Sequence, residues 1–170
     1  IDSEYLSMGI GLLAIKAAQW VSQGLSTEEI YQKIEALKPK VRTSFVIDTL
    51  KYLHMGGRCS SIELIAGTVL KIRPQILVKD GSLVVLDKHR GKKEKVLNAF
   101  YKKYVSDNGK IDTDSIVIAH SADIDSAEFL RNKASNDFDS KNIYLAEAGT
   151  VISSHCGPGT VGIIYIEKDE

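Results

Sequence analysis

The dipeptide Asp80-Gly81 constrains the fold most, because it separates two short runs that are rich in β-forming residues. The runs are QILVK, directly after Pro74, and SLVVLD, directly after Gly81. Asp-Gly accepts the positive φ angles of a two-residue hairpin turn, so the two runs predict an antiparallel hairpin. A hairpin argues against a purely parallel sheet.

Strand and helix patterns alternate along the rest of the chain. Alternation of this kind predicts the α/β class, here with a mixed sheet. The first helical segment is apolar at nearly every position, which is typical of a buried helix. The predicted helices cover residues 8–22, 26–39, a short stretch after Asp48-Thr49, about 60–70, about 92–105 and 124–134. The predicted strands, besides the hairpin, cover residues 43–47, 115–119, 142–147, 150–154 and 160–166.

The two ends of the chain differ in what they can fold into. Residues 1–40 offer the end of a strand and two helices, which is too little sheet to close a core. Residues 41–170 contain every element that a compact α/β domain needs. The chain begins with Ile1 rather than Met, so we interpret residues 1–40 as the remnant of a preceding domain.

Composition excludes several functional classes. The 22 basic and 22 acidic residues give a formal net charge of zero, so no global field recruits nucleic acid. No apolar run approaches the roughly 20 residues that span a bilayer, and the polar amino terminus lacks a signal-peptide pattern. We therefore expect a cytoplasmic protein. Cys59 and Cys156 are too far apart in sequence for a disulfide framework or a zinc pattern.

The segment from Ser153 to Thr160, SSHCGPGT, is the strongest candidate site. The hydroxyl of Ser154, the imidazole of His155 and the turn amides of Gly157 and Gly159 suit a carboxylate or phosphate. A structural hairpin turn with a surface histidine remains the alternative.

Two further segments could bind an anion. Gly56-Gly57-Arg58 precedes the hydroxyl residues Ser60-Ser61 at a predicted helix start, although a helix end with a solvated arginine explains it equally. The basic run from Lys88 to Lys93 includes Arg90 and opposes the dipole of the helix that follows. A solvated basic turn is the alternative there.

The sequence contains few combinations of residues that could act as a catalytic site. Ser154 beside His155 is no dyad if the segment is extended, because adjacent side chains then point to opposite faces. Cys156 could act as a nucleophile only with His89 or His120 close enough to serve as base. No zinc-protease, Walker A or dinucleotide pattern is present.

A series of short motifs runs along nearly the whole chain, each weak alone but specific in this order. They are Asp2-Ser3, Ser7-Met8-Gly9-x-Gly11, Phe45-Val46-Ile47-Asp48-Thr49-Leu50-x-x-Leu53, Gly56-Gly57-Arg58, Lys71-Ile72-x-Pro74, Asp80-Gly81, Arg90-Gly91 and His155-x-Gly157-Pro158-Gly159. In this order they resemble the DegV family of bacterial fatty-acid-binding proteins. Cys156 and Cys59 depart from the pattern, which has a small polar and an aliphatic residue there.

The resemblance implies a carrier with two α/β domains, not an enzyme. Such a carrier buries a long-chain fatty acid, uses no other cofactor, and presents the carboxylate to a separate fatty acid kinase that makes acyl-phosphate. By similarity, His155 and Arg90 lie near the carboxylate or the new phosphate, and Arg58 belongs to a basic surface that docks the kinase. The family's carboxylate-gripping hydroxyl residues precede Ile1. The competing hypotheses are an enzyme with hydrolytic or transfer activity at His155 and Cys156, and an interaction module without lipid.

Overall fold

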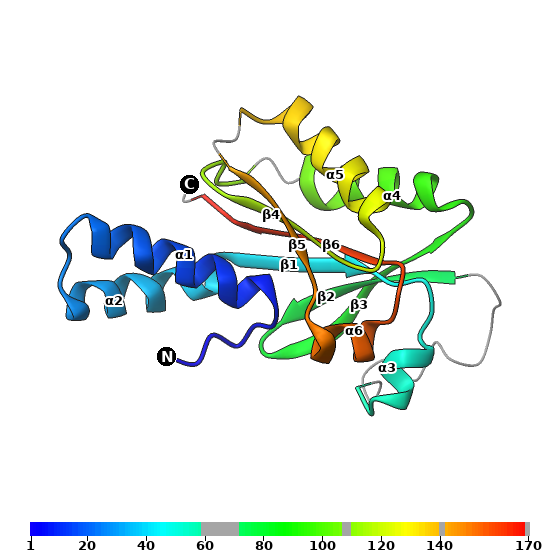
Figure 1. Ribbon diagram of the computed structural model, residues 1–170, viewed down its shortest axis with the longest axis horizontal. Helices are drawn as coiled ribbons and strands as arrows, with labels where there is room; N and C mark the ends of the chain where they lie inside the picture. Colours follow the sequence, from blue (N-terminus) through cyan, green and yellow to red (C-terminus); the bar gives the residue numbers. More distant parts are fainter. Residues whose placement is uncertain (59–71, 107–109, 140–141, 169–170) are drawn as a thin grey trace.

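The computed structural model describes residues 1–58, 72–106, 110–139 and 142–168. Six strands of these residues form one sheet in the order β3-β2-β1-β6-β4-β5 (Figure 1). β4 and β5 are parallel, and every other neighbouring pair is antiparallel, so the predicted mixed α/β sheet is confirmed. The strands are β1 (Val41–Val46), β2 (Ile72–Lys79), β3 (Ser82–Arg90), β4 (Ile116–Ser121), β5 (Ile143–Glu147) and β6 (Thr160–Ile166).

The hairpin between β2 and β3 is confirmed. Asp80 and Gly81 have φ angles of 50° and 69°, the positive values that a two-residue turn of this kind requires. The register is irregular between Gln75 and Ile76, where β3 has an additional residue. β2 begins at Ile72, three residues before the predicted run QILVK, and therefore contains Pro74.

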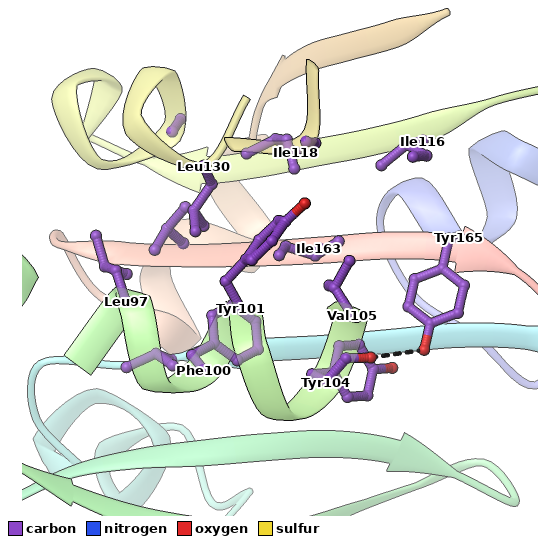
Figure 2. Packing of buried hydrophobic residues seen from close by; sticks show 14 of the residues in the cluster. Leu97, Phe100, Tyr101, Tyr104, Val105, Ile116, Ile118, Leu130, Ile163 and Tyr165 are labelled. Carbon is purple, nitrogen blue, oxygen red and sulfur yellow. Dashed lines mark hydrogen bonds between the residues drawn. The ribbon is translucent and has the colours of Figure 1, made fainter. Parts of the chain in front are cut away.

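One face of the sheet is covered by α4 (Lys93–Tyr101), a π-helical turn (Lys102–Ser106) and α5 (Ile124–Asp137) (Figure 1). Figure 2 shows the aromatic and aliphatic side chains that these elements pack against β4 and β6. The hydroxyl of Tyr165 donates a 2.9 Å hydrogen bond to the carbonyl of Tyr104 within this core. These side chains form one buried apolar cluster on this face of the sheet.

The opposite face is covered in two parts. α1 (Met8–Ser22) and α2 (Thr27–Leu37) pack Leu12, Leu13 and Ile34 on β1, β4 and β6. The predicted start of α2 is confirmed: Ser26 and Glu29 form a reciprocal capping box.

The prediction that α1 is buried all round was wrong, because only one face meets the sheet. Ile10 and Val21, on the other face, are 48% and 62% exposed. Because residues 1–40 share a core with β4 and β6, no break in packing marks the predicted boundary near residue 40. The assignment of this segment to a preceding domain stays a prediction.

The second part of this face consists of α3 (Lys51–Met55) and α6 (Thr150–Cys156), which contact each other. Residues 150–154 were predicted as a strand, and this prediction was wrong. The β-branched residues Thr150, Val151 and Ile152 suggest a strand locally, but Ile152 and Cys156 lie four residues apart and pack on one apolar cluster. The predicted helix over residues 60–70, with its Ser60-Ser61 start, lies outside the described residues.

None of the helices in the described part of the chain is long and apolar enough to cross a bilayer.

Candidate functional site

A small cavity of about 40 Å³ lies between the sheet, the segment before α1 and the helix α6. Its wall is mainly apolar, with Ile152 and Cys156 contributed by α6. The sheet and the segment before α1 contribute Leu6, Ser7, Thr43, Ser44, Phe45, Ala119, His120, Ser121, Thr160, Gly162 and Ile164. The hydroxyl of Thr43 is buried and has no hydrogen-bond partner among the described residues. A cavity of this size is a fraction of the roughly 300 Å³ or more of a ligand pocket, so these residues form one wall of a larger site at most.

His155 precedes the cavity-lining residue Cys156 on α6 and does not itself line the cavity. Its imidazole packs so closely on Gly56, at the end of α3, that a Cβ added there would lie 2.6 Å from Cε1 and closer still to Nδ1. Nδ1 is buried and has no hydrogen-bond partner among the residues that the structure describes. A buried, unpaired nitrogen costs about 1–3 kcal/mol, which makes this atom a candidate for a ligand contact.

A second basic side chain, that of Arg58, also contacts Gly56. The guanidinium of Arg58 donates a 2.8 Å hydrogen bond to the carbonyl of Gly56, the residue on which His155 packs. Arg58 is exposed, so the rest of its guanidinium is available to an anion or a partner. The sequence predicted these two residues separately, and the fold brings them to the two sides of one glycine.

The Gly157-Pro158-Gly159 turn joins α6 to β6, and both glycines are required sterically. Gly157 has a φ of 77° and lies against the ring of Tyr52, and Gly159 has a φ of 78° and lies against the carboxylate of Asp48. A side chain at either position would be strained and would collide with its neighbour. The two glycines of the turn are therefore packed against Tyr52 and Asp48. Because α6 precedes the turn, it is not the hairpin turn that the sequence left open as the alternative.

An ion-pair network that the sequence did not predict surrounds this turn. The ammonium of Lys93 contacts the Gly159 carbonyl, Asp48 Oδ1 at 2.8 Å and Asp123 Oδ2 at 3.2 Å. Arg73 Nε donates to the same Asp48 oxygen at 2.7 Å. Burial would raise the pKa of Asp48, but the hydrogen bonds and charges of Lys93 and Arg73 outweigh it and leave that pKa below its ordinary value.

The remaining predicted site residues lie less centrally. Arg90 is exposed at the end of β3, opposite Ile72, and no contact within the described ranges joins it to His155. The hydroxyl of Ser154 donates to the carbonyl of Val151, one turn back on α6. A direct ligand contact of either residue stays a prediction.

The alternative catalytic arrangement lacks support from geometry. Burial raises the pKa of the Cys156 thiol to about 11, so the thiol is protonated near neutral pH and is a poor nucleophile. His120 lines the same cavity as Cys156, but among the described residues no hydrogen bond joins the thiol to His120 or to His89. His120 Nδ1 accepts from the amide of Asp123, and His89 is bonded to Gln75 at 3.1 Å. Within the described residues, no group of three or more metal-ligating side chains is placed to hold a metal ion.

Comparison with known proteins places the chain in a family. Residues 1–168 match the family model described as "Uncharacterised protein, DegV family COG1307". The chain belongs to the DegV family. A DegV domain-containing protein of Caldanaerobacter subterraneus is 32% identical over an alignment of 173 positions, which covers 99% of this chain and 60% of that protein.

Solved DegV structures have the same fold. The Streptococcus pneumoniae Fatty Acid Kinase (Fak) B3 protein, loaded with linoleic acid, matches with a TM-score of 0.87 at 27% identity. The match covers 99% of this chain and 59% of that one. A fatty acid binding DegV family protein of Streptococcus agalactiae matches with a TM-score of 0.84 at 28% identity, covering 99% and 59%. The chain thus spans about 60% of the length of these relatives.

Proposed function

We propose that this DegV-family chain takes part in binding a long-chain fatty acid, and presents its carboxylate to a separate fatty acid kinase in the cytoplasm. One observation carries the proposal: α6 places Ile152 and Cys156 in the wall of an apolar cavity, and the next residue back along the helix, His155, packs its imidazole on Gly56 close to Arg58. An apolar wall next to a basic pair, His155 and Arg58, matches the two ends of a fatty acid.

The two ends of such a ligand have different tasks. Burial of a C16 tail at about 0.8 kcal/mol per CH₂ supplies on the order of 10 kcal/mol before the ordering cost, so the tail provides most of the affinity. The carboxylate contacts then fix orientation. A carboxylate that reaches an imidazole nitrogen of His155 would receive a charge-assisted hydrogen bond when the imidazole is protonated.

Presentation of the carboxylate to a kinase would require basic residues on the surface of the protein, and two of the predicted site residues are exposed. Arg58 lies on the solvent side of Gly56, and Arg90 is exposed at the end of β3. We propose Arg58 as part of the surface that docks the kinase and Arg90 as a contact of the new phosphate. The solved relative named as a fatty acid kinase B3 protein supports a kinase as the partner.

Extraction of the purified natural protein tests lipid binding. Organic extraction followed by mass spectrometry should release about one equivalent of fatty acid from the natural full chain. Absence of any fatty acid, with no uptake of added palmitate, would leave the lipid-free interaction module as the better hypothesis.

Kinase coupling is tested separately. His155→Ala and Arg90→Ala should lower acyl-phosphate formation with the kinase and ATP much more than they lower fatty acid retention. Lys95→Met is the control, because Lys95 is an exposed residue of α4 outside the site. Equal loss of retention and transfer in the two alanine variants would contradict the proposed division of tasks.

A further inference from the structure

We infer that Lys93, together with Asp48, is a positioning residue for His155. The inference rests on the proposed function, because it assigns a task to residues that do not themselves touch the fatty acid. The evidence is the set of contacts that Lys93 and Asp48 make with the turn leading out of α6.

Lys93 joins three separate parts of the fold at one atom. Its ammonium contacts the Gly159 carbonyl in the turn, Asp48 just after β1 and Asp123 at the start of α5. An ammonium has three N–H donors, so all three are used. The side chain is only 22% exposed, which limits competition from water.

Asp48 contacts the same turn. Its carboxylate lies against the Cα of Gly159 and also accepts a hydrogen bond from Arg73 Nε at 2.7 Å. Gly159 is therefore contacted by the Lys93 ammonium at its carbonyl and by the Asp48 carboxylate at its Cα. Its amide is fixed as well, by a 2.9 Å hydrogen bond to the carbonyl of Ser121.

Two hydrogen bonds connect the turn that contains Gly159 to the end of α6, where His155 lies. The Thr160 hydroxyl donates a 3.0 Å hydrogen bond to the carbonyl of Cys156, and the Gly157 amide donates a 2.8 Å hydrogen bond to the carbonyl of Ser153. These bonds tie the end of α6 to the turn. The ring of His155 then has little freedom, because it packs directly on Gly56.

The charges of the network also favour a role in positioning. Lys93 and Arg73 are matched by Asp48 and Asp123, so the network presents no unpaired cation to an incoming carboxylate. An anion is therefore expected to bind at the nearby His155 and Arg58, while Lys93 keeps its protein contacts. Loss of Lys93 should affect the orientation of the head group more than the affinity for the tail.

The test compares Lys93→Met, Lys93→Arg and the control Lys95→Met in the natural full chain. Three measurements are made: fatty acid retention by extraction and mass spectrometry, the His155 imidazole resonances by NMR, and the kinetics (kcat and KM) of phosphorylation of the bound fatty acid. Lys93→Met should shift the His155 resonances and lower kcat at least about tenfold, with retention and KM within about twofold of wild type. Lys93→Arg should restore much of kcat, and Lys95→Met should change nothing.

Unchanged His155 resonances and unchanged kcat in Lys93→Met would overturn the inference. If Lys93→Met fails to fold, Asp48→Asn provides the same test, because it keeps the side-chain shape and removes only the charge. A wild-type protein that holds no fatty acid would refute the proposed function instead. The His155 resonances would still report whether Lys93 positions the imidazole.

Discussion

Replacement of Gly56 with alanine should move the imidazole of His155 while leaving the backbone at position 56 unstrained. Gly56 has φ −80° and ψ 0°, values that alanine adopts readily. The new Cβ would lie 2.6 Å from Cε1 of His155, whereas non-bonded heavy atoms separate to about 3.5 Å. The ring must therefore retreat by about 1 Å or more.

A displacement of this size has different consequences for chemistry and for stability. Misplacement by about 1 Å can cost on the order of 100-fold in rate, so phosphorylation of the bound fatty acid should fall by about that factor. The free energy of unfolding should change by less than about 1 kcal/mol, because the reduced entropy of the unfolded chain offsets part of the steric cost. Fatty acid retention should persist, because the tail supplies most of the affinity.

The assay measures acyl-phosphate formation with the kinase and ATP, alongside urea unfolding and the NMR resonances of His155. Gly149→Ala is the matched control: Gly149 flanks the start of α6 with φ −63°, and a Cβ there meets nothing within 4 Å. Wild-type resonances and a wild-type rate in Gly56→Ala would refute the reasoning. The same loss in Gly149→Ala would also refute it.

Three further predictions concern the thiol, the core and a helix end. Because burial raises the Cys156 pKa from 9.0 to about 11, the folded state retains this proton longer than the unfolded chain. Alkylation of Cys156 should therefore be slow at pH 8, and the unfolding free energy should fall as pH rises from about 9 to 11; fast alkylation at pH 8 would contradict this. Tyr165→Phe removes the buried hydrogen bond to the Tyr104 carbonyl and should cost about 1–2 kcal/mol in urea unfolding without changing lipid retention. Gly24→Ala places a side chain at a φ of 82° and should lower the free energy of unfolding by about 1 kcal/mol. An unchanged midpoint of urea unfolding would show that α1 does not depend on this glycine.

The features predicted correctly from sequence are those with local causes. The turn at Asp80-Gly81 follows from positive φ angles that few residue pairs accept, and the start of α2 follows from Ser26 and Glu29, three residues apart. The motifs also single out His155 and Arg58 as candidates, and their roles stay a prediction. Their meeting at Gly56 could not be predicted, because it depends on how α3 and α6 pack.

The errors and omissions have long-range causes. The local sequence of residues 150–154 is compatible with a strand or a helix. The segment is a helix because this places both Ile152 and Cys156 against one apolar cluster. Asp48 and Lys93 are 45 residues apart, and only the sheet order brings them together. The basic run from Lys88 to Lys93 did mark the region, but it suggested an external anion, whereas Lys93 is paired with Asp48 and Asp123.

A crystal structure of the natural full chain with bound fatty acid tests the central claim most directly. The account predicts a carboxylate oxygen about 2.7–3.2 Å from an imidazole nitrogen of His155, with the acyl chain against Ile152 and Cys156. A carboxylate bound away from His155, or a tail that leaves the cavity beside α6 untouched, would contradict it.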